Sequence, residues 1–572
     1  MNTNRKISAA TMLLSALAAT NAAGQVSNWA SAVNGNWNDA TKWDNGIPLV
    51  STQSAVLGLA GGYSVTLNTS PTINELHVTN PGAILTISPA TTLGLAGSSI
   101  TNEGRIQINP TGSASNGILR IDNALTLSGS GEIWMRSQGS DDSQITGLGD
   151  LTNAAGHEIR GVGQISIPTT NDGTIAADVS VSVSGGTLTL FSDVVNNAML
   201  EGRPGSNLDL SGVTIDQTAG GSLFADNTGN INVTSVDATV LFGTIETAGS
   251  GEFNINPAGV GLLSGVINNG TIEVLFNGSL HIDSMGIENN GTIDMNRAGS
   301  ASDSTFLATQ SAEISGNGVI NMKALGSNDT QINTDIGAVL THGVDHEIRG
   351  VGYINAELVN DGIITADVGV SVSGNTLVMQ TNPKTNNDLM IAASGSILQF
   401  SGITLDQLGG GQLVTNGGEV RLFNTTVLGG VYNAFGGLLR SQPGTNSISG
   451  ITLNGPSIIE PNSTVVVDAE GMVNNGVMQI NPVGSASNSV VTFSETASLA
   501  GTGEFQLRSE GSDDSAKCGP TAVFRFPAAR SPSKPTTRSI TRSWSRHLPA
   551  RSASSVSMWI KQEAECSWPT AG

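Results

Sequence analysis

Two short segments of this chain carry residue types that could perform acid–base chemistry. The first is His157-Glu158-Ile159-Arg160, and the second is an identical run, His346-Glu347-Ile348-Arg349. A glutamate can transfer protons, and a nearby arginine can hold an anionic group of a substrate. Asp141 and Asp142 lie shortly before the first segment and could add further carboxylates. Taken alone, these residues are typical of enzymes that cleave polysaccharides with carboxyl groups.

The duplication of the segment argues against catalysis. An active site is normally built once, whereas each of these residues recurs at an equivalent position. Ion pairs between glutamate and arginine on neighbouring turns of the chain explain the recurrence better. We therefore expect both segments to have a structural role, and we assign no catalytic residue.

Three pairs of adjacent aspartate or asparagine residues raise the question of calcium binding. They are Asp141-Asp142, Asn328-Asp329 and Asp513-Asp514. Carboxylates in turns can bind Ca²⁺, but the sequence lacks the glycine–aspartate nonapeptide of calcium-binding β-rolls. It also lacks cysteine–histidine spacings of the zinc-binding kind and a glycine-rich turn between a strand and a helix. The sequence predicts no metal and no other cofactor.

The chain contains a long internal repeat. The run Gly112-Ser113-Ala114-Ser115 recurs from Gly299 and again from Gly484. The three copies begin near positions 101, 288 and 473, and the third departs from the pattern after Ser515. Chains duplicated in this way, here with a period of about 186 residues, usually build an extended surface by stacking.

A shorter unit of one turn and one strand lies within the long repeat. Asn-Asn-Gly precedes an alternating strand at 268–270 and again at 289–291. Glycine permits a positive φ and asparagine tolerates it, while the alternation buries one face of the strand. The pattern predicts an all-β chain that forms a right-handed parallel β-solenoid with coils of about 21 residues. About 20 such coils, spaced ~4.8 Å apart, would form a rod of about 90 Å. Because Asn-Gly is also a hairpin signal, repeats of an antiparallel sandwich or barrel are the alternative.

The N-terminal part of the chain divides into two regions. Residues 1–23 have a positively charged start, an apolar stretch and small residues before Gly24, which is the pattern of an export signal. Residues 24–100 contain Trp29, Trp37 and Trp43 and are expected to cap the solenoid and supply its first strands.

The rest of the chain also forms two regions. The solenoid itself is expected over 101–515. Residues 516–572 hold both cysteines and 9 of the 24 basic residues. We interpret this segment as a disordered basic tail that arose from a shift of reading frame inside the third copy. The alternative is a functional basic tail that binds polyanions or the cell envelope.

Charge and cysteine content limit the classes of partner. The formal net charge is -22, so an acidic surface argues against nucleic acid as a ligand. Residues 1–517 contain no cysteine, so packing and hydrogen bonds must hold the solenoid together. The apolar stretch near the N-terminus is shorter than a membrane-spanning helix requires, and no transmembrane segment is expected after removal of the signal.

The tryptophan segment carries a resemblance to a known group of proteins. Asn36-Trp37-Asn38 and Lys42-Trp43-Asp44-Asn45-Gly46-Ile47-Pro48, together with Trp29, resemble the N-terminal segment of large exported bacterial repeat proteins. These are the autotransporter-passenger-like β-strand-repeat surface proteins of planctomycetes and their relatives, which often have a C-terminal sorting segment. The motif covers the chain only up to about position 100, and the rest is similar only in style. The resemblance implies a secreted or cell-surface location, but it carries over no functional residue and does not extend to a sorting segment.

These observations predict a non-catalytic structural or adhesion-type protein that is secreted or displayed at the cell surface. It would present a long polar face to extracellular glycan, matrix or other cell-surface components through many weak contacts. The alternative is a carbohydrate-active enzyme, a polysaccharide lyase or hydrolase on the same scaffold. That alternative requires one cluster of carboxylates that the other repeats do not match. A passenger of an outer-membrane exporter is a third interpretation.

Overall fold

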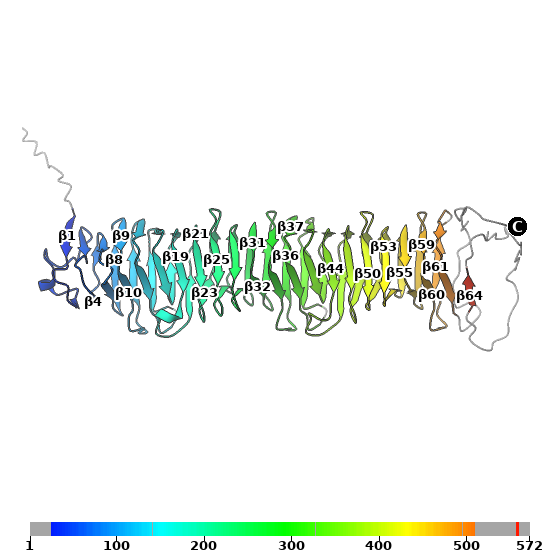
Figure 1. Ribbon diagram of the computed structural model, residues 1–572, viewed down its shortest axis with the longest axis horizontal. Helices are drawn as coiled ribbons and strands as arrows, with labels where there is room; N and C mark the ends of the chain where they lie inside the picture. Colours follow the sequence, from blue (N-terminus) through cyan, green and yellow to red (C-terminus); the bar gives the residue numbers. More distant parts are fainter. Residues whose placement is uncertain (1–23, 140, 327, 495, 509–555, 560–572) are drawn as a thin grey trace, which may run out of the picture.

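The computed structural model describes residues 24–508 and 556–559, apart from residues 140, 327 and 495. These residues wind into one elongated, right-handed parallel β-solenoid of about 20 turns (Figure 1). The predicted fold class is therefore confirmed. The expected export signal and nearly all of the expected tail lie outside the described residues. Within the tail, β64 (Val556–Trp559) pairs with β63 (Glu504–Leu507) in antiparallel orientation.

Each turn of the solenoid contributes one short strand to each of three sheets. An early turn has β3 (Gln53–Val56) in sheet 1, β4 (Tyr63–Leu67) in sheet 2 and β5 (Thr72–Ile73) in sheet 3. The chain then returns to sheet 1, where β6 (Leu76–Val78) pairs in parallel with β3. Between residues 24 and 508 every described strand pairing is parallel, and the isolated bridge between Trp29 and Trp43 is antiparallel. These pairings exclude the hairpin alternative.

The core is a set of apolar columns that run along the rod. In sheet 2, Leu85 of β7 (Ala83–Ile87) lies in register with Ile106 of β10 (Arg105–Ile108). The column continues through Ile133 and Ile159, and all four side chains are fully buried. Because alternate residues point inward, each turn covers the apolar face of the next and excludes water from it.

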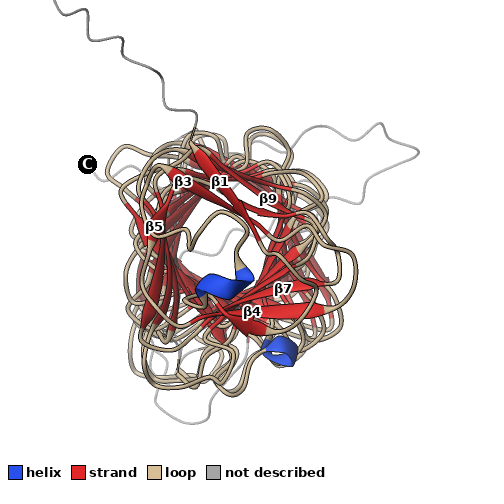
Figure 2. Cartoon of the chain, turned by 90° about the vertical axis from the view of Figure 1, so that its left-hand side faces the viewer, coloured by secondary structure: helices blue, strands red, loops and turns tan. Residues whose placement is uncertain are grey.

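Three tryptophans close the N-terminal end of this core. Trp43 packs edge-on against Trp29 and Trp37, with ring centroids 5.1 and 4.9 Å apart. The Trp37 indole donates a 3.0 Å hydrogen bond to the carbonyl of Pro48, and all three rings are buried. Figure 2 shows the short helix η1 (Ala40–Lys42) across the mouth of the solenoid. The segment shields apolar side chains that would otherwise face water at the open end of the rod.

The turns differ in length more than the sequence predicted. Asn268 and Asn289 occupy equivalent positions in neighbouring turns and are 21 residues apart, as expected. Other equivalent pairs are closer or further apart: 18 residues separate Asn153 from Asn171, and 27 residues separate Asp294 from Asn321. The parallel pairing fixes the strands alone, so long loops at the corners lengthen a turn without disturbing the core.

The long repeat does not contain a whole number of turns. Its equivalent strands are β10 in sheet 2, β35 (Thr292–Met295) in sheet 3 and β60 (Val477–Ile480) in sheet 1. Successive copies are therefore 25 strands apart, which is eight turns and one strand. Each copy begins one sheet further around the solenoid than the copy before it.

Twist of the sheets offsets this step. Figure 1 shows long loops in the cyan, green and orange parts of the chain, and all project from the lower edge of the rod. A step of one sheet is a third of a rotation, and successive copies are eight turns and one strand apart. A twist of about 14° per turn, in the opposite sense, therefore returns equivalent loops to the same side. This value lies within the usual range of twist between neighbouring strands. At ~4.8 Å per turn, the copies are about 40 Å apart along that side.

Candidate functional site

The structure separates the histidine of the first candidate segment from its two charged residues. The segment forms the corner before β16 (Glu158–Gly161) and the strand itself. His157 points into the core, where its Nε2 lies 3.0 Å from the Asn102 amide and its Nδ1 lies 2.9 Å from the Asn153 oxygen. Glu158 and Arg160 project from the outer face, because alternate side chains of a strand point to opposite sides. The histidine is therefore separated from both charged residues by the wall of the solenoid.

The second segment repeats this arrangement with an added histidine. His346, just before β41 (Glu347–Gly350), is fully buried, and its Nδ1 lies 2.9 Å from Nε2 of His342. His346 Nε2 lies 2.9 Å from the amide of Asn289. Burial lowers the pKa of His157 and His342 to about 4 and that of His346 to about 3. All three rings are accordingly neutral at physiological pH.

The buried histidines extend ladders of side-chain amides inside the corners of the solenoid. The Asn153 amide donates to Asn171, and Asn171 donates to Asn196, at 2.9 Å in both cases. A second ladder joins Asn360 to Asn386 at 2.8 Å. Stacking places equivalent amides one above another, so in these ladders the amide of one turn donates to the amide oxygen of the next. The histidines therefore belong to the structural interior.

The outward charges of the first segment are held in a network across four turns. Arg160 lies 3.3 Å from Glu132 and 3.3 Å from Asp178, and it lies 3.9 Å from Glu158. Arg203 contacts Asp178 at 3.0 Å and Glu158 at 2.5 Å. Burial opposes ionisation of Asp178, but hydrogen bonds from Ser180 and Arg203 outweigh it and lower the pKa of this carboxyl. The two arginines are thus engaged by carboxylates of the protein.

An aromatic ring lies within the same network. Trp134 on β13 (Glu132–Met135) donates its indole N–H to Glu132, and the Arg105 guanidinium lies 3.5 Å from the ring centroid. The second copy lacks this arrangement, because Asn321 occupies the place opposite Arg349 and accepts a 2.8 Å hydrogen bond from it. Arg349 lies 3.9 Å from Glu347. The charged surroundings of the two segments therefore differ although the segments are identical.

The acidic pairs stabilise loops. Asp142 is buried and accepts hydrogen bonds from the backbone N–H of Gln138 at 3.0 Å and of Gly139 at 2.6 Å. Asp329 is likewise buried and accepts from the backbone N–H of Gly326. Asp513-Asp514 lies outside the described residues. Among the residues that are described, no three His, Cys, Asp or Glu side chains gather as metal ligands.

The long loops form a ridge along one side of the rod, here called the loop ridge. In the first copy it consists of 109–116 after β10, 136–142 after β13 and 178–186 after β19 (Thr174–Ala177), the last including η2 (Val179–Val181). The third loop folds back over the other two: Ser184 donates a 2.7 Å hydrogen bond to the carbonyl of Gln138, and Val183 packs on Gly112.

The second copy of the loop ridge repeats these contacts. Ser373, the counterpart of Ser184, donates a hydrogen bond to the carbonyl of Leu325, and Val372 packs on Gly299. In the third copy the first loop, 481–488, follows β60, and a Cβ added to Gly484 would meet no atom of the described residues within 4 Å. The described part of the chain thus presents two copies of the ridge in which the third loop covers the first, together with the first loop of a third copy.

A cluster of carboxylates that the sequence analysis missed lies on the outer face of sheet 3. Arg297 contacts Glu252 and lies 2.9 Å from Glu273, while Lys323 lies 2.7 Å from Asp294. Burial raises the pKa of Glu273 to about 7, since only 6% of its side chain is exposed. The available signal was the outward position of Glu273 and Asp294 in strands of neighbouring turns, each after an Asn-Asn-Gly turn.

The other long repeats do not match this cluster. When the copies are aligned on the repeated Gly-Ser-Ala-Ser run, the first has Thr86 in place of Glu273 and Pro110 in place of Arg297. The third copy has an isoleucine and a proline at these positions. The cluster is therefore specific to the second copy.

The fold defines the chain as a right-handed parallel β-solenoid with a duplicated loop ridge. No protein-family model matches the sequence, and no curated protein is significantly similar to it. Within the described part of the chain, no helix combines the length and the hydrophobicity that crossing a bilayer requires.

Proposed function

We propose that the protein is an exported, non-catalytic rod of the cell surface or extracellular space, with a structural or adhesive role. The observation that carries this proposal is the return of the loop ridge to one side of the rod, about 40 Å apart in successive copies. Equivalent surfaces at fixed spacing suit many weak contacts with one extended partner, because each contact raises the effective concentration of the next.

The partner proposed is extracellular glycan, matrix or another component of a cell surface. The chain has 46 acidic and 24 basic residues, and this excess of negative charge supports these partners over nucleic acid. The engagement of Arg160 and Arg203 by neighbouring carboxylates supports it further, since neither arginine is free for a phosphate. Export through residues 1–23 is part of the same proposal.

Expression of the full chain in a bacterium with a secretion system tests export. Mass spectrometry of the protein recovered outside the cytoplasm should give an N-terminus at Gly24. Adhesion is tested with beads that carry the exported protein, mixed with beads that carry extracellular polysaccharide or with whole cells. Clustering above the level of albumin-coated beads is expected. Retention of an uncleaved chain in the cytoplasm, or clustering no greater than that of albumin, would count against the proposal.

A carbohydrate-active enzyme is the second candidate, because the second copy holds the unmatched cluster of Glu252, Glu273 and Asp294. A glutamate with a pKa near 7 can act as a general acid beside an ionised carboxylate. Against this role, Arg297 bridges Glu252 and Glu273, so a substrate would have to displace the arginine.

Polysaccharide digestion separates the two candidates. The purified full chain and the E273Q variant are incubated with soluble glycans, and new reducing ends are measured. Turnover by the wild type that E273Q abolishes would establish the enzyme. We expect equal, background levels from both proteins.

A further inference from the structure

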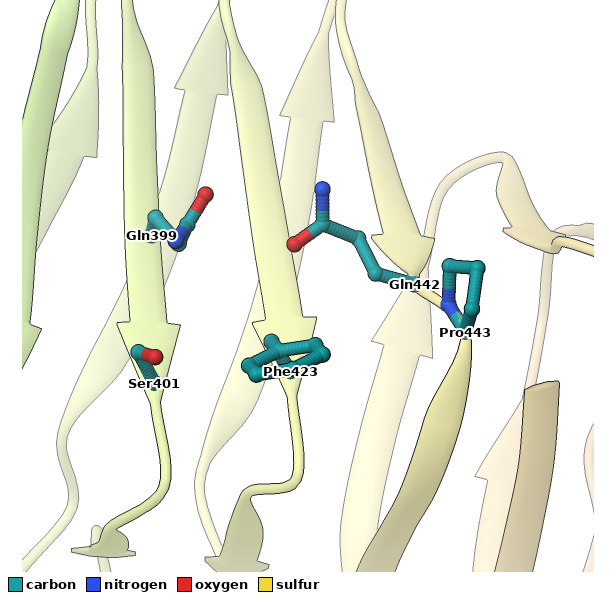
Figure 3. Close-up of a pocket in the computed structure, with 5 residues that line it drawn as sticks. All are labelled: Gln399, Ser401, Phe423, Gln442 and Pro443. Carbon is teal, nitrogen blue, oxygen red and sulfur yellow. The ribbon is translucent and has the colours of Figure 1, made fainter.

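The outer face of sheet 1 has a shallow hollow of about 360 Å³ in the C-terminal half of the rod (Figure 3). Its lining comes from β48 (Ile397–Ser401), β51 (Glu419–Phe423) and the residues that follow β54 (Leu438–Ser441). The lining residues are Gln399, Ser401, Phe423, Gln442 and Pro443.

An aromatic ring forms the centre of the hollow. Phe423 lies in register with Ser401 on the preceding turn, and 38% of the residue is exposed. Figure 3 shows Gln399 and Ser401 on one side of the ring, with Gln442 and Pro443 on the other. An exposed aromatic ring flanked by amides and a hydroxyl combines an apolar surface with hydrogen-bonding groups.

The hollow interrupts a ladder of amides on the outer surface. Asn355 donates to Asn333 at 2.8 Å, and Gln380 donates to Asn355 at 3.1 Å. Gln380 lies in register with Ser401, so the same row then reaches Phe423, which cannot continue the ladder.

The amides around the ring are left available. Among the described residues, the side chains of Gln399 and Gln442 make no hydrogen bond, although outward amides elsewhere on sheet 1 are paired. Each amide can donate and accept, which matches the hydroxyl groups of a sugar.

The charges beside the hollow are already matched. Glu419 lies 3.0 Å from Arg421 and also pairs with Arg440, which in turn lies 2.7 Å from Glu460. Two arginines thus face two glutamates, and the surroundings favour a ligand without net charge.

We propose that this hollow binds one sugar unit of an uncharged glycan, with a face of the sugar on Phe423 and its hydroxyl groups on Gln399 and Gln442. A sugar presents C–H groups on one face and hydroxyl groups at its rim, which suits an aromatic surface bordered by amides. The proposal rests on the proposed surface role and names the chemical class of one partner. A single shallow site of this kind binds weakly, and adhesion would depend on many rods acting together.

The test uses the full chain and four uncharged hexasaccharides: cellohexaose, laminarihexaose, chitohexaose and maltohexaose. Binding is measured by saturation-transfer NMR and titration calorimetry. At least one of the four should bind, and F423A and Q442A should each weaken that binding by about tenfold or more. F435A is the matched control, since Phe435 ends β53 (Val431–Phe435) in sheet 3 and is 67% exposed.

Three results would overturn the proposal. They are no binding of any of the four sugars, unchanged binding by F423A and Q442A, and an equal loss in F435A. Q442A alters an amide without hydrogen bonds, so it remains informative even if F423A folds poorly. Adhesion of beads without hexasaccharide binding would remove this site and leave the proposed surface role standing.

Discussion

Acidification should weaken the solenoid selectively where histidines are buried. His157 lies in one inner corner, and His342 and His346 lie together in another. Their pKa values in the folded protein are about 4, 4 and 3. An unfolded histidine has a pKa of about 6.5. Between these values the unfolded segment takes up protons that the folded segment does not, so stability falls as the pH falls below about 6.5.

The size of the effect follows from these pKa values. At pH 5, relative to pH 7.5, each buried histidine should cost about 2 kcal/mol of folding free energy. The turns around His342 and His346 should therefore lose about 4 kcal/mol, and the turn around His157 should lose about 2 kcal/mol. The loss should be local, because each turn of a solenoid contacts only its neighbours.

Hydrogen–deuterium exchange with peptide resolution measures this local loss. Opening free energies are compared at pH 7.5 and 5.0 for peptides that span 340–350 and 153–161. Peptides within 199–255, which contain no histidine, are the internal control. Asparagine is chosen for the variant His342→Asn because Asn153 occupies the equivalent position in the first copy of the repeat. This variant should recover about 2 kcal/mol of the loss around 340–350.

Two outcomes would contradict this account. If peptides with and without histidine lost protection equally, the buried rings would not be the source of the acid sensitivity. If His342→Asn left the pH dependence of 340–350 unchanged, His342 would not be held neutral by burial.

Three further predictions concern the cap, the glycine that ends β41 and a buried lysine. Trp37→Ala should cost about 3–5 kcal/mol in the first turns, seen as faster exchange over 53–102 with no change over 397–441. Gly350→Ala should lower the melting temperature followed by circular dichroism, because φ of Gly350 is +124° and an added Cβ would clash with the Met322 carbonyl. The cost in folding free energy is about 1–3 kcal/mol or more. Gly337→Ala is the control and should cost less, since a Cβ added there meets open space. Lys384 is fully buried, and its ammonium donates to three backbone carbonyls. Burial lowers its pKa to about 7, whereas an unfolded lysine has a pKa of about 10.4. Between these values the unfolded chain holds a proton that the folded chain has lost, so the stability of the fold should rise as the pH rises from about 7 towards about 10.4. Urea unfolding of Lys384→Met should lack that rise, and a rise equal to that of the wild type would contradict this assignment.

The core of the fold could be predicted because it depends on local pattern. Alternation in strands such as Thr292–Met295 specifies one inward and one outward face, and Asn-Gly turns specify where the chain changes direction. Recurrence of both features about 21 residues apart leaves few arrangements other than stacked coils.

The candidate site could be predicted only in part. Identical residues at His157 and His346 correctly indicated equivalent places in the repeat. Their separation from Glu158 and Glu347 by the wall of the solenoid was missed, because it depends on where each corner ends and each strand begins. The cluster around Glu273 was missed for a related reason: its three carboxylates come from three different turns.

The all-β, parallel and repetitive character of the chain follows from spacings along the backbone, which the sequence contains in full. The side of the rod that each copy faces follows only from the folded molecule. The repeat of 25 strands moves equivalent residues by one sheet, and the twist between neighbouring turns moves them back. Twist accumulates from small rotations in every pair of strands, and no residue type in the sequence records that sum.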